Sequence, residues 1–314
     1  MQTVKVPVAP QYPERPITVI VPFSAGSGLD VLARIMEKGA LKHLGQPLII
    51  VNKAGGSGTI GWNEIAGSNP DGYTIGMSGI DLVLQPIYGV AKYNYMTALE
   101  PIAQIAPSPF VIAVQGSQPW QNIDQLINYA RQYPGEIKFG HWGTGSLGHV
   151  IGEVLGKTAN VSLEQVPFRG GSEAMAALLG GHIQIAIVSP AMVKEHIKSG
   201  TVKVLAVTSD KRIADPVFSN IPTFKEEGLD IVFNLWFGVT APKELPVEVK
   251  NKLSNGFRAI ITDPEIVSDI ESLGLHVEYL DPQNTAMQWQ QDNKKLTKTV
   301  KETGILDLIK SQKQ

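Results

Sequence analysis

Strand-like and helix-like segments alternate from Ile17 to about residue 207, and this alternation restricts the fold more than any other feature. The run "PITVIVPF" has the apolar character of a buried strand, and "LDVLARIMEKGALKHLG" has helical spacing and ends at Gly45. "PLIIVN" and "YTIGMSG" repeat the strand signal, with the helix-like "WNEIAGSN" between them. Strands that alternate with helices are typical of βαβ units. The sequence therefore predicts an α/β fold with mostly parallel sheets flanked by helices.

Two extended segments divide this pattern into two sets of strands and helices. "PIAQIAPSPFVIAVQ" is a long apolar stretch broken by Pro107 and Pro109, and "IVFNLWFGVTAP" follows the second set. A chain of 314 residues is long enough for about two domains. We expect each extended segment to cross between two α/β lobes, as in a clamshell binding protein with a hinge. The predicted first lobe contains residues 1–106 and 234–314, including the C-terminal helices, and the second contains residues 107–233.

The composition excludes several classes of partner and site. The net charge of −2 gives no basic excess for nucleic acid or an anionic membrane surface. Cysteine is absent, which excludes disulfides, thiolate metal sites and a cysteine nucleophile. No apolar run reaches the roughly 18 residues of a transmembrane helix. The first 16 residues have no apolar signal core, so an export signal, if the protein has one, is absent from this sequence.

Glycine-rich turns follow the predicted strands in both sets. They read "VPFSAGSGLD", "VNKAGGSGTIG", "GHWGTGSLGH" and "PFRGGSEAM". Each turn places free backbone N–H groups and the positive end of a helix at the carboxyl edge of a sheet, where ligands of open α/β sheets bind. A carboxylate or phosphate can accept several charge-assisted hydrogen bonds there. The alternative is that each turn only caps its helix.

The segment from Gly143 to Gly148 matches the dinucleotide-binding pattern G-x-G-x-x-G. The same pattern also spans Gly56 to Gly61, so it is a weak signal in a chain with 31 glycines. The acidic residue that should bind ribose lies about 20 residues further on. Glu164 stands at that distance but within a predicted strand, and Asp81 follows a less compact loop. Dinucleotide binding is therefore disfavoured.

Catalytic and metal-binding patterns are also missing, and we predict no catalytic residue, no metal and no cofactor. The chain has neither a G-x-S-x-G elbow nor an H-E-x-x-H motif. His141 and His149 are eight residues apart across a turn, which favours surface or capping positions over a metal site. Four serines at strand ends lack an obvious base and suit hydrogen bonds to a ligand better than nucleophilic attack. They are Ser24, Ser78, Ser146 and Ser189.

Among the charged residues, Arg169 either faces the cleft and pairs with a carboxylate or faces solvent beside its turn. Asp30 is expected in the first turn of its helix, where its charge favours the helix dipole. Four aromatic residues adjoin turns or crossings and either line a pocket or belong to the core. They are Phe23, Trp142, Phe168 and Trp236.

The ordered set of motifs resembles the periplasmic solute receptors of tripartite tricarboxylate transporters, also called Bug receptors. The matching segments include "YPERPITVIVPFSAGSGLDVLAR", "LGQPLIIVNKAGGSGTIGWNEIA", "PDGYTIGMSG", "GTGSLGH", "VPFRGGSEAMAALLGGHIQIAIV", "KVLAVTSDKR", "IPTFKEEGLD" and "WFGVTAPKELP". They cover nearly the whole chain after Tyr12, in order. The resemblance implies a two-lobed protein that closes on small organic acids, whose carboxylates are held mainly by backbone amides and ordered waters.

The resemblance also implies the positions of the binding residues. On one side they are Phe23, Ser24, Ala25, Gly26, Ser27 and Gly28, with Ser78 and Gly79 nearby. On the other side they are Gly143, Thr144, Gly145, Ser146, Gly170 and Gly171. We add His149, Arg169 and Ser189 to this candidate set. Two departures from the family pattern matter: Ser24, Ser27 and Leu29 alter the hydroxyls of the first loop, and Ser189 stands where some relatives have an Asp that meets a ligand amine. We therefore expect a carboxylate without an amine, such as a dicarboxylate or an aromatic acid.

The resemblance implies an extracytoplasmic, monomeric receptor that passes its ligand to the membrane components of a transporter. Two alternatives come from other classes. One is an enzyme, either a dinucleotide-dependent oxidoreductase or a hydrolase with a serine in the cleft. The other is a sensory ligand-binding module, which needs the same clamshell as a transport receptor.

Overall fold

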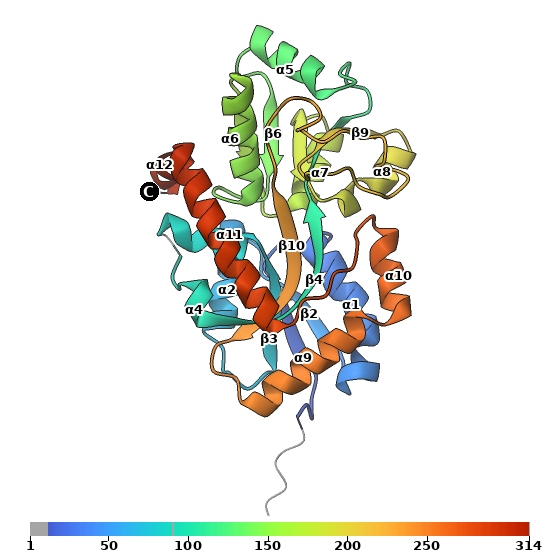
Figure 1. The fold of residues 1–314 in the computed structure, drawn as a ribbon, viewed down its shortest axis with the longest axis vertical. Helices are drawn as coiled ribbons and strands as arrows, with labels where there is room; N and C mark the ends of the chain where they lie inside the picture. The colour runs from blue at the N-terminus through green and yellow to red at the C-terminus, as the bar shows by residue number, and fades with distance from the viewer. Residues whose placement is uncertain (1–11, 90, 314) are drawn as a thin grey trace, which may run out of the picture.

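Two five-stranded sheets form the centres of two lobes in the computed structural model, which describes residues 12–89 and 91–313 (Figure 1). The first sheet has the strand order β2-β1-β3-β10-β4. Its strands are β1 (Ile17–Val21), β2 (Leu48–Asn52), β3 (Thr74–Gly79), β4 (Leu99–Pro109) and β10 (Asn234–Pro242). β1 is parallel to β2 and β3, whereas β10 is antiparallel to both of its neighbours, β3 and β4. Four strands thus share one direction, as predicted for a mostly parallel sheet.

The second sheet repeats this plan with the order β7-β6-β8-β5-β9. Its strands are β5 (Val111–Gln115), β6 (Lys138–His141), β7 (Glu164–Pro167), β8 (Ile185–Val188) and β9 (Val202–Val207). β6 is parallel to β7 and β8, and β5 is antiparallel to β8 and β9. In each sheet, the one antiparallel strand, β10 or β5, lies next to the central strand.

The chain passes between the lobes at two neighbouring points. The first crossing joins β4 to β5 at Phe110, and the second leads from β9 into β10. β4 and β10 pair from Leu99 opposite Pro242 to Pro109 opposite Asn234, so both crossings leave the first sheet side by side. These strands run along the middle of the molecule (Figure 1). The two-lobed clamshell is confirmed, while the division at residues 106 and 233 stays a prediction.

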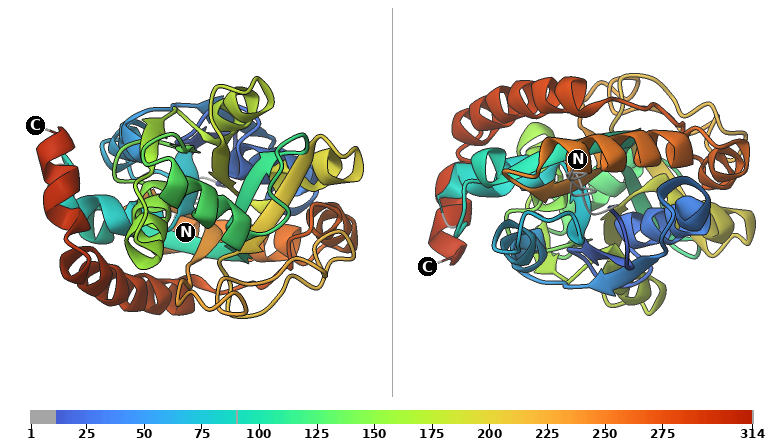
Figure 2. Two further views of the ribbon diagram at one scale, coloured as in Figure 1. Left: turned by 90° about the horizontal axis from the view of Figure 1, so that it is seen from above. Right: turned by 90° about the horizontal axis from the view of Figure 1, so that it is seen from below.

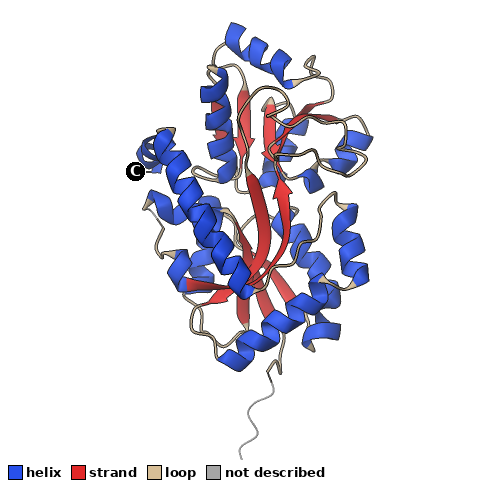
Figure 3. Cartoon of the chain, in the orientation of Figure 1, coloured by secondary structure: helices blue, strands red, loops and turns tan. Residues whose placement is uncertain are grey.

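Helices cover the faces of both sheets (Figure 3). Those of the first lobe are α1 (Gly28–Leu44), α2 (Thr59–Ala66), α3 (Asp81–Leu84), α4 (Tyr95–Ala98), α9 (Val247–Ile261) and α10 (Pro264–Ser272), with short 3₁₀ helices η1 (Gly56–Gly58) and η2 (Gln85–Tyr88). Those of the second are α5 (Ile123–Gln132), α6 (Leu147–Ala159), α7 (Gly171–Leu179), α8 (Lys194–Lys198) and η3 (Pro190–Met192). α1 ends as predicted at Gly45, whose φ of 88° lies in the left-handed region that glycine tolerates.

Two further helices, α11 (Pro282–Glu302) and α12 (Ile305–Lys313), lie along one side of the molecule (Figure 2). Asp263 and Asp281 cap the amino ends of α10 and α11, because each carboxylate accepts a hydrogen bond from a backbone N–H of the first turn. Within residues 12–89 and 91–313, no helix is both long and apolar enough to cross a bilayer.

Candidate functional site

The turns at the carboxyl ends of the parallel strands meet across the space between the lobes. Ser24, between β1 and α1, has its Oγ 2.8 Å from the Oγ of Ser172 in the first turn of α7. The Ser57 hydroxyl donates a hydrogen bond of 2.8 Å to the carbonyl oxygen of Thr144, just before α6. These bonds join residues of different lobes. The lobes are therefore closed on each other in this structure.

Two of the predicted glycines make this close approach sterically possible. A Cβ atom on Gly143 would lie 2.6 Å from the Oγ of Ser57, closer than real Cβ contacts allow. A Cβ atom on Gly170 would collide with the Oγ of Ser24. Gly170 has extended backbone with φ of −178°, so the absence of a side chain there serves the contact between lobes rather than the local conformation.

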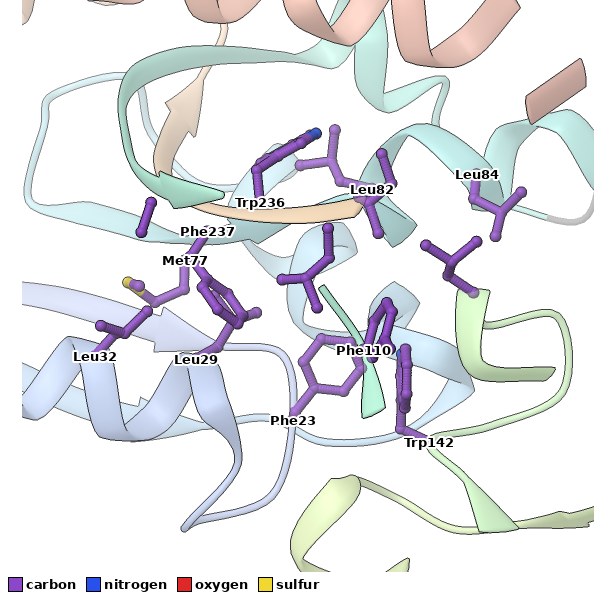
Figure 4. Close-up of a cluster of buried hydrophobic side chains, with 14 of the residues drawn as sticks. Phe23, Leu29, Leu32, Met77, Leu82, Leu84, Phe110, Trp142, Trp236 and Phe237 are labelled. Carbon is purple, nitrogen blue, oxygen red and sulfur yellow. The ribbon is translucent and has the colours of Figure 1, made fainter. Parts of the chain in front are cut away.

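A cavity of about 60 Å³ lies between the closed lobes, and most of its wall is apolar. The apolar part consists of Phe23, Leu29, Ile80, Phe110, Trp142, Val188, Met192, Leu235, Trp236 and Phe237. The remaining wall residues are Ser27, Gly28, Gly79, Asp81, Gly171 and Ser189, and no lysine or arginine is among these described residues. Figure 4 shows Phe23, Phe110 and Trp142 close together, with the rings of Phe110 and Trp142 stacked 4.8 Å apart.

The amino end of α1 forms one polar side of the cavity. Ser27 caps the helix, because its Oγ accepts a hydrogen bond of 3.4 Å from the amide of Asp30, and Gly28 begins it. The Asp30 carboxylate accepts bonds from the Gly26 amide (2.8 Å) and from Arg34 (3.0 and 3.1 Å). Burial alone would raise the pKa of Asp30, but these bonds outweigh it and lower the pKa. Asp30 therefore fixes the loop before α1 in its ionised form.

The amino end of α7 and Ser189 form the opposite polar side. Gly171 is the first residue of α7, and Ser189 directly follows β8. The Ser189 Oγ is buried and has no hydrogen-bond partner among the described residues. A Cβ atom on Gly28 would lie 3.1 Å from this oxygen, so the hydroxyl sits beside the first turn of α1. The positive ends of two helices and one free hydroxyl thus border the same cavity.

The glycine turn before α6 differs, because its N–H groups are bound within the protein. The Gly145 amide donates to Nδ1 of His149 over 3.1 Å, and the Ser146 amide donates to the carbonyl oxygen of Gly143 over 2.9 Å. The Leu147 amide donates to Oδ1 of Asp81 over 2.6 Å. These three amides of the nucleotide-like motif therefore already donate to acceptors within the protein.

His141 and His149 pack against this turn, so of their two predicted positions, surface or capping, the surface position is wrong. Both side chains are fully buried, with rings stacked 4.5 Å apart. They do bind the turn, through Nδ1 of His141 to Gly143 and Nδ1 of His149 to Gly145. Burial and the neighbouring His149 lower the pKa of His141 to about 3, although hydrogen bonds to Gln165 and Gly143 partly offset this. No group of three or more His, Cys, Asp or Glu in the described part of the chain could hold a metal ion.

Arg169 lies outside the apolar cavity, at a separate and larger opening of about 600 Å³ between the lobes. This opening is lined by Gly55, Gly56, Ser57, Thr59, Gly143, Thr144, Pro167, Phe168, Arg169 and Glu173. Arg169 is exposed, and its amide donates to the carboxylate of Glu173 over 3.0 Å. Arg169 is thus exposed at an opening between the lobes, and its pairing with a ligand carboxylate stays a prediction.

The candidate residues therefore fall into three groups. Those in the wall of the apolar cavity are Phe23, Ser27, Gly28, Gly79, Gly171 and Ser189. Those at the separate opening are Gly143, Thr144 and Arg169. The residues that line neither space are Ser24, Ala25, Gly26, Ser78, Gly145, Ser146, His149 and Gly170. Of the four predicted aromatic wall residues, Phe168 lies at the separate opening and the other three line the cavity.

Asp81 is a polar residue of the cavity wall that was not predicted from the sequence to face the cleft. It begins α3, two residues after the end of β3, and its side chain is buried. Its place just beyond a strand end at the carboxyl edge of the sheet is the available signal. Phe110, Leu235 and Phe237 were also not predicted, because apolar residues on the crossings look like core residues in the sequence.

The model of the "Tripartite tricarboxylate transporter family receptor" matches residues 32–305. Protein BugT of Bordetella pertussis is 30% identical over 303 residues, which are 94% of this chain and 91% of BugT.

Two solved structures resemble the chain over most of its length. R. palustris Rpa4515, solved with adipate, is 29% identical with a TM-score of 0.88, covering 93% of this chain and 98% of that one. A TctC solute binding protein from Polaromonas, solved with no ligand, is 33% identical with a TM-score of 0.66, covering 93% and 99%.

Proposed function

The chain belongs to the tripartite tricarboxylate transporter receptor family, and from this premise we propose that it binds a small organic carboxylate in the cavity between its lobes. We propose further that it works outside the cytoplasm as a monomer and delivers the ligand to the membrane components of a transporter. The family is one of solute receptors, which sets the oxidoreductase and hydrolase alternatives aside. The adipate of Rpa4515 supports a carboxylate as the ligand class.

The observation that carries this proposal is the convergence of the α1 and α7 amino ends on a buried hydroxyl. Gly28, Gly171 and Ser189 line one cavity, and the Ser189 hydroxyl has no protein partner among the described residues. Backbone amides and a hydroxyl can all donate to a carboxylate, and each such charge-assisted bond is worth roughly 1.5–3 kcal/mol. A glycine at each helix start leaves room for the carboxylate to approach the backbone.

Closure of the lobes brings these donors together, since α1 and α7 belong to different lobes. A ligand that contacts both stabilises the closed state by its greater affinity for that state.

Calorimetric titration of the folded wild-type protein with a panel of mono- and dicarboxylates tests the proposal. We expect at least one to bind and NAD to give no heat. We expect Gly28→Val to weaken binding at least about tenfold, because its side chain would point at the Ser189 Oγ and the ring of Phe237. Ala176→Val, at an exposed position further along α7 that lines neither opening between the lobes, is the matched control and should bind normally. Failure of every carboxylate to bind the native wild type would refute the proposal.

A further inference from the structure

A carboxylate of the protein itself occupies the amino end of α6 at the wall of the cavity. Asp81 Oδ1 accepts a hydrogen bond of 2.6 Å from the Leu147 amide, and Oδ2 accepts one of 2.6 Å from the indole Nε1 of Trp142. Asp81 follows β3 of the first lobe, whereas both donors belong to the second. The side chain is buried and lines the cavity.

We propose that the Asp81 carboxylate occupies the place that a second carboxylate of the ligand would need. The receptor therefore selects ligands with a single carboxylate and an uncharged, apolar remainder. This inference rests on the proposed function, because it presupposes a carboxylate ligand in the cavity. It narrows the ligand class and makes Asp81 a specificity-determining residue.

The hydrogen bonds of the three helix ends support this assignment. The ends of α1 and α7 border the cavity beside the free Ser189 hydroxyl and can receive a ligand carboxylate. At α6, by contrast, the amides of Gly145, Ser146 and Leu147 already donate to acceptors of the protein. A second ligand carboxylate would have to displace Asp81 to use this end. One anion position therefore remains for the ligand.

The charge and polarity of the wall point the same way. A second ligand carboxylate would lie near the buried Asp81 carboxylate, and no described lysine or arginine lines the cavity to offset their repulsion. Both Asp81 oxygens already accept short bonds from buried N–H groups, which satisfies them without a ligand cation. The wall of the same cavity includes the rings of Phe110, Trp142 and Phe237, which suit a hydrocarbon chain or an aromatic ring.

Three ligands of equal chain length test the inference on the wild-type protein. Hexanoate, adipate and 6-aminohexanoate carry a neutral, an anionic and a cationic tail, and their dissociation constants can be measured by calorimetry. We expect hexanoate to bind at least about tenfold more tightly than either of the others. Benzoate against terephthalate gives the same comparison for an aromatic ligand.

The outcomes separate this inference from the proposed function. Adipate, terephthalate or 6-aminohexanoate binding as tightly as its neutral-tailed partner would overturn the single-carboxylate inference and leave the receptor function standing. Binding of none of these acids, nor of any other carboxylate, would instead remove the proposed function itself.

Substitution of Asp81 then tests the residue. Asp81→Ala frees the Leu147 amide and removes the repelling charge, so the ratio of adipate to hexanoate affinity should rise at least about tenfold. A purely structural loss would weaken both acids alike and leave the ratio unchanged. Asp124→Ala, in the first turn of α5 and exposed, is the control. If Asp81→Ala does not fold, Asp81→Asn keeps the shape and should shift the ratio in the same direction; an unchanged ratio in the folded variant overturns the assignment.

Discussion

Ser189 and Ser78 are two buried hydroxyls that differ mainly in what they face. Neither Oγ has a hydrogen-bond partner within the described residues. Ser189 lines the interlobe cavity, whereas Ser78 lies in β3 near Gly238 of the paired strand β10 and is not part of the cavity wall. The same polar group therefore faces a ligand position in one case and the interior of the sheet in the other.

We expect Ser189→Ala to weaken carboxylate binding about tenfold, which corresponds to about 1.4 kcal/mol, because one donor to the ligand is lost. The free energy of unfolding of the ligand-free protein should stay the same or rise, since an unsatisfied buried hydroxyl is removed. Ser78→Ala should show the same stability effect with wild-type affinity. Titration calorimetry and denaturant unfolding measure the two quantities, and equal affinity losses in both variants would contradict the assignment of Ser189.

At the scale of elements, the β6–α6 turn shows that the amides of a glycine motif can bind acceptors of the protein instead of a ligand. Its amides bind His149 and Asp81, and His141 holds Gly143 from behind. Burial of His141 depends on this arrangement, because the ring is covered by α6 and β7 partners such as His149 and Gln165. The turn is thus part of the folded core as well as the edge of the cleft.

The low pKa of His141, about 3, predicts that acid destabilises the protein. The unfolded chain binds a proton at His141 below about pH 6.5, whereas the folded chain resists it down to about pH 3. This contribution to stability is therefore complete above about pH 6.5 and declines by up to about 1.4 kcal/mol per pH unit as the pH falls below that value.

Unfolding by urea between pH 7 and pH 4.5 measures this dependence. His141→Gln should flatten the curve, whatever its effect on stability at pH 7, and His182→Gln, at an exposed histidine, should not. Parallel curves for wild type and His141→Gln would show that another group carries the acid sensitivity.

At the scale of the whole molecule, closure depends on small residues where the lobes touch. Gly170 and Ser24 come from different lobes and leave no space for a Cβ atom between them. Because the backbone of Gly170 is extended, an alanine can adopt its conformation within the second lobe. A side chain at position 170 would therefore hinder closure of the lobes without disturbing the fold of either lobe.

Gly170→Ala should hold the lobes apart and weaken all ligands by a similar factor, about tenfold, without lowering the melting temperature of the ligand-free protein. Small-angle X-ray scattering should show less compaction on ligand addition than for the wild type. The double variant Gly170→Ala with Ser24→Gly restores the space and should recover both affinity and compaction. Wild-type affinity in the single variant would show that this contact does not limit closure.

The two-lobed α/β fold, the end of α1 at Gly45 and the family were all accessible from the sequence. Strand and helix periodicity, capping residues and ordered motifs are local signals, and they survive folding largely unchanged. The position of turns at sheet edges follows from the same alternation. The sequence by itself thus determined the architecture and the loops from which a site is built.

Only the tertiary structure decided which of those loops keep donors for a ligand. The Leu147 amide is taken by Asp81, 66 residues earlier in the chain, while the Ser189 hydroxyl remains without a partner. The cavity wall comes from Phe110 and Phe237 on the crossings, which no local pattern distinguishes from core residues. The physical reason is that the burial of a residue and the pairing of its polar groups depend on side chains from distant segments. The sequence of a turn does not specify which of those side chains will contact it.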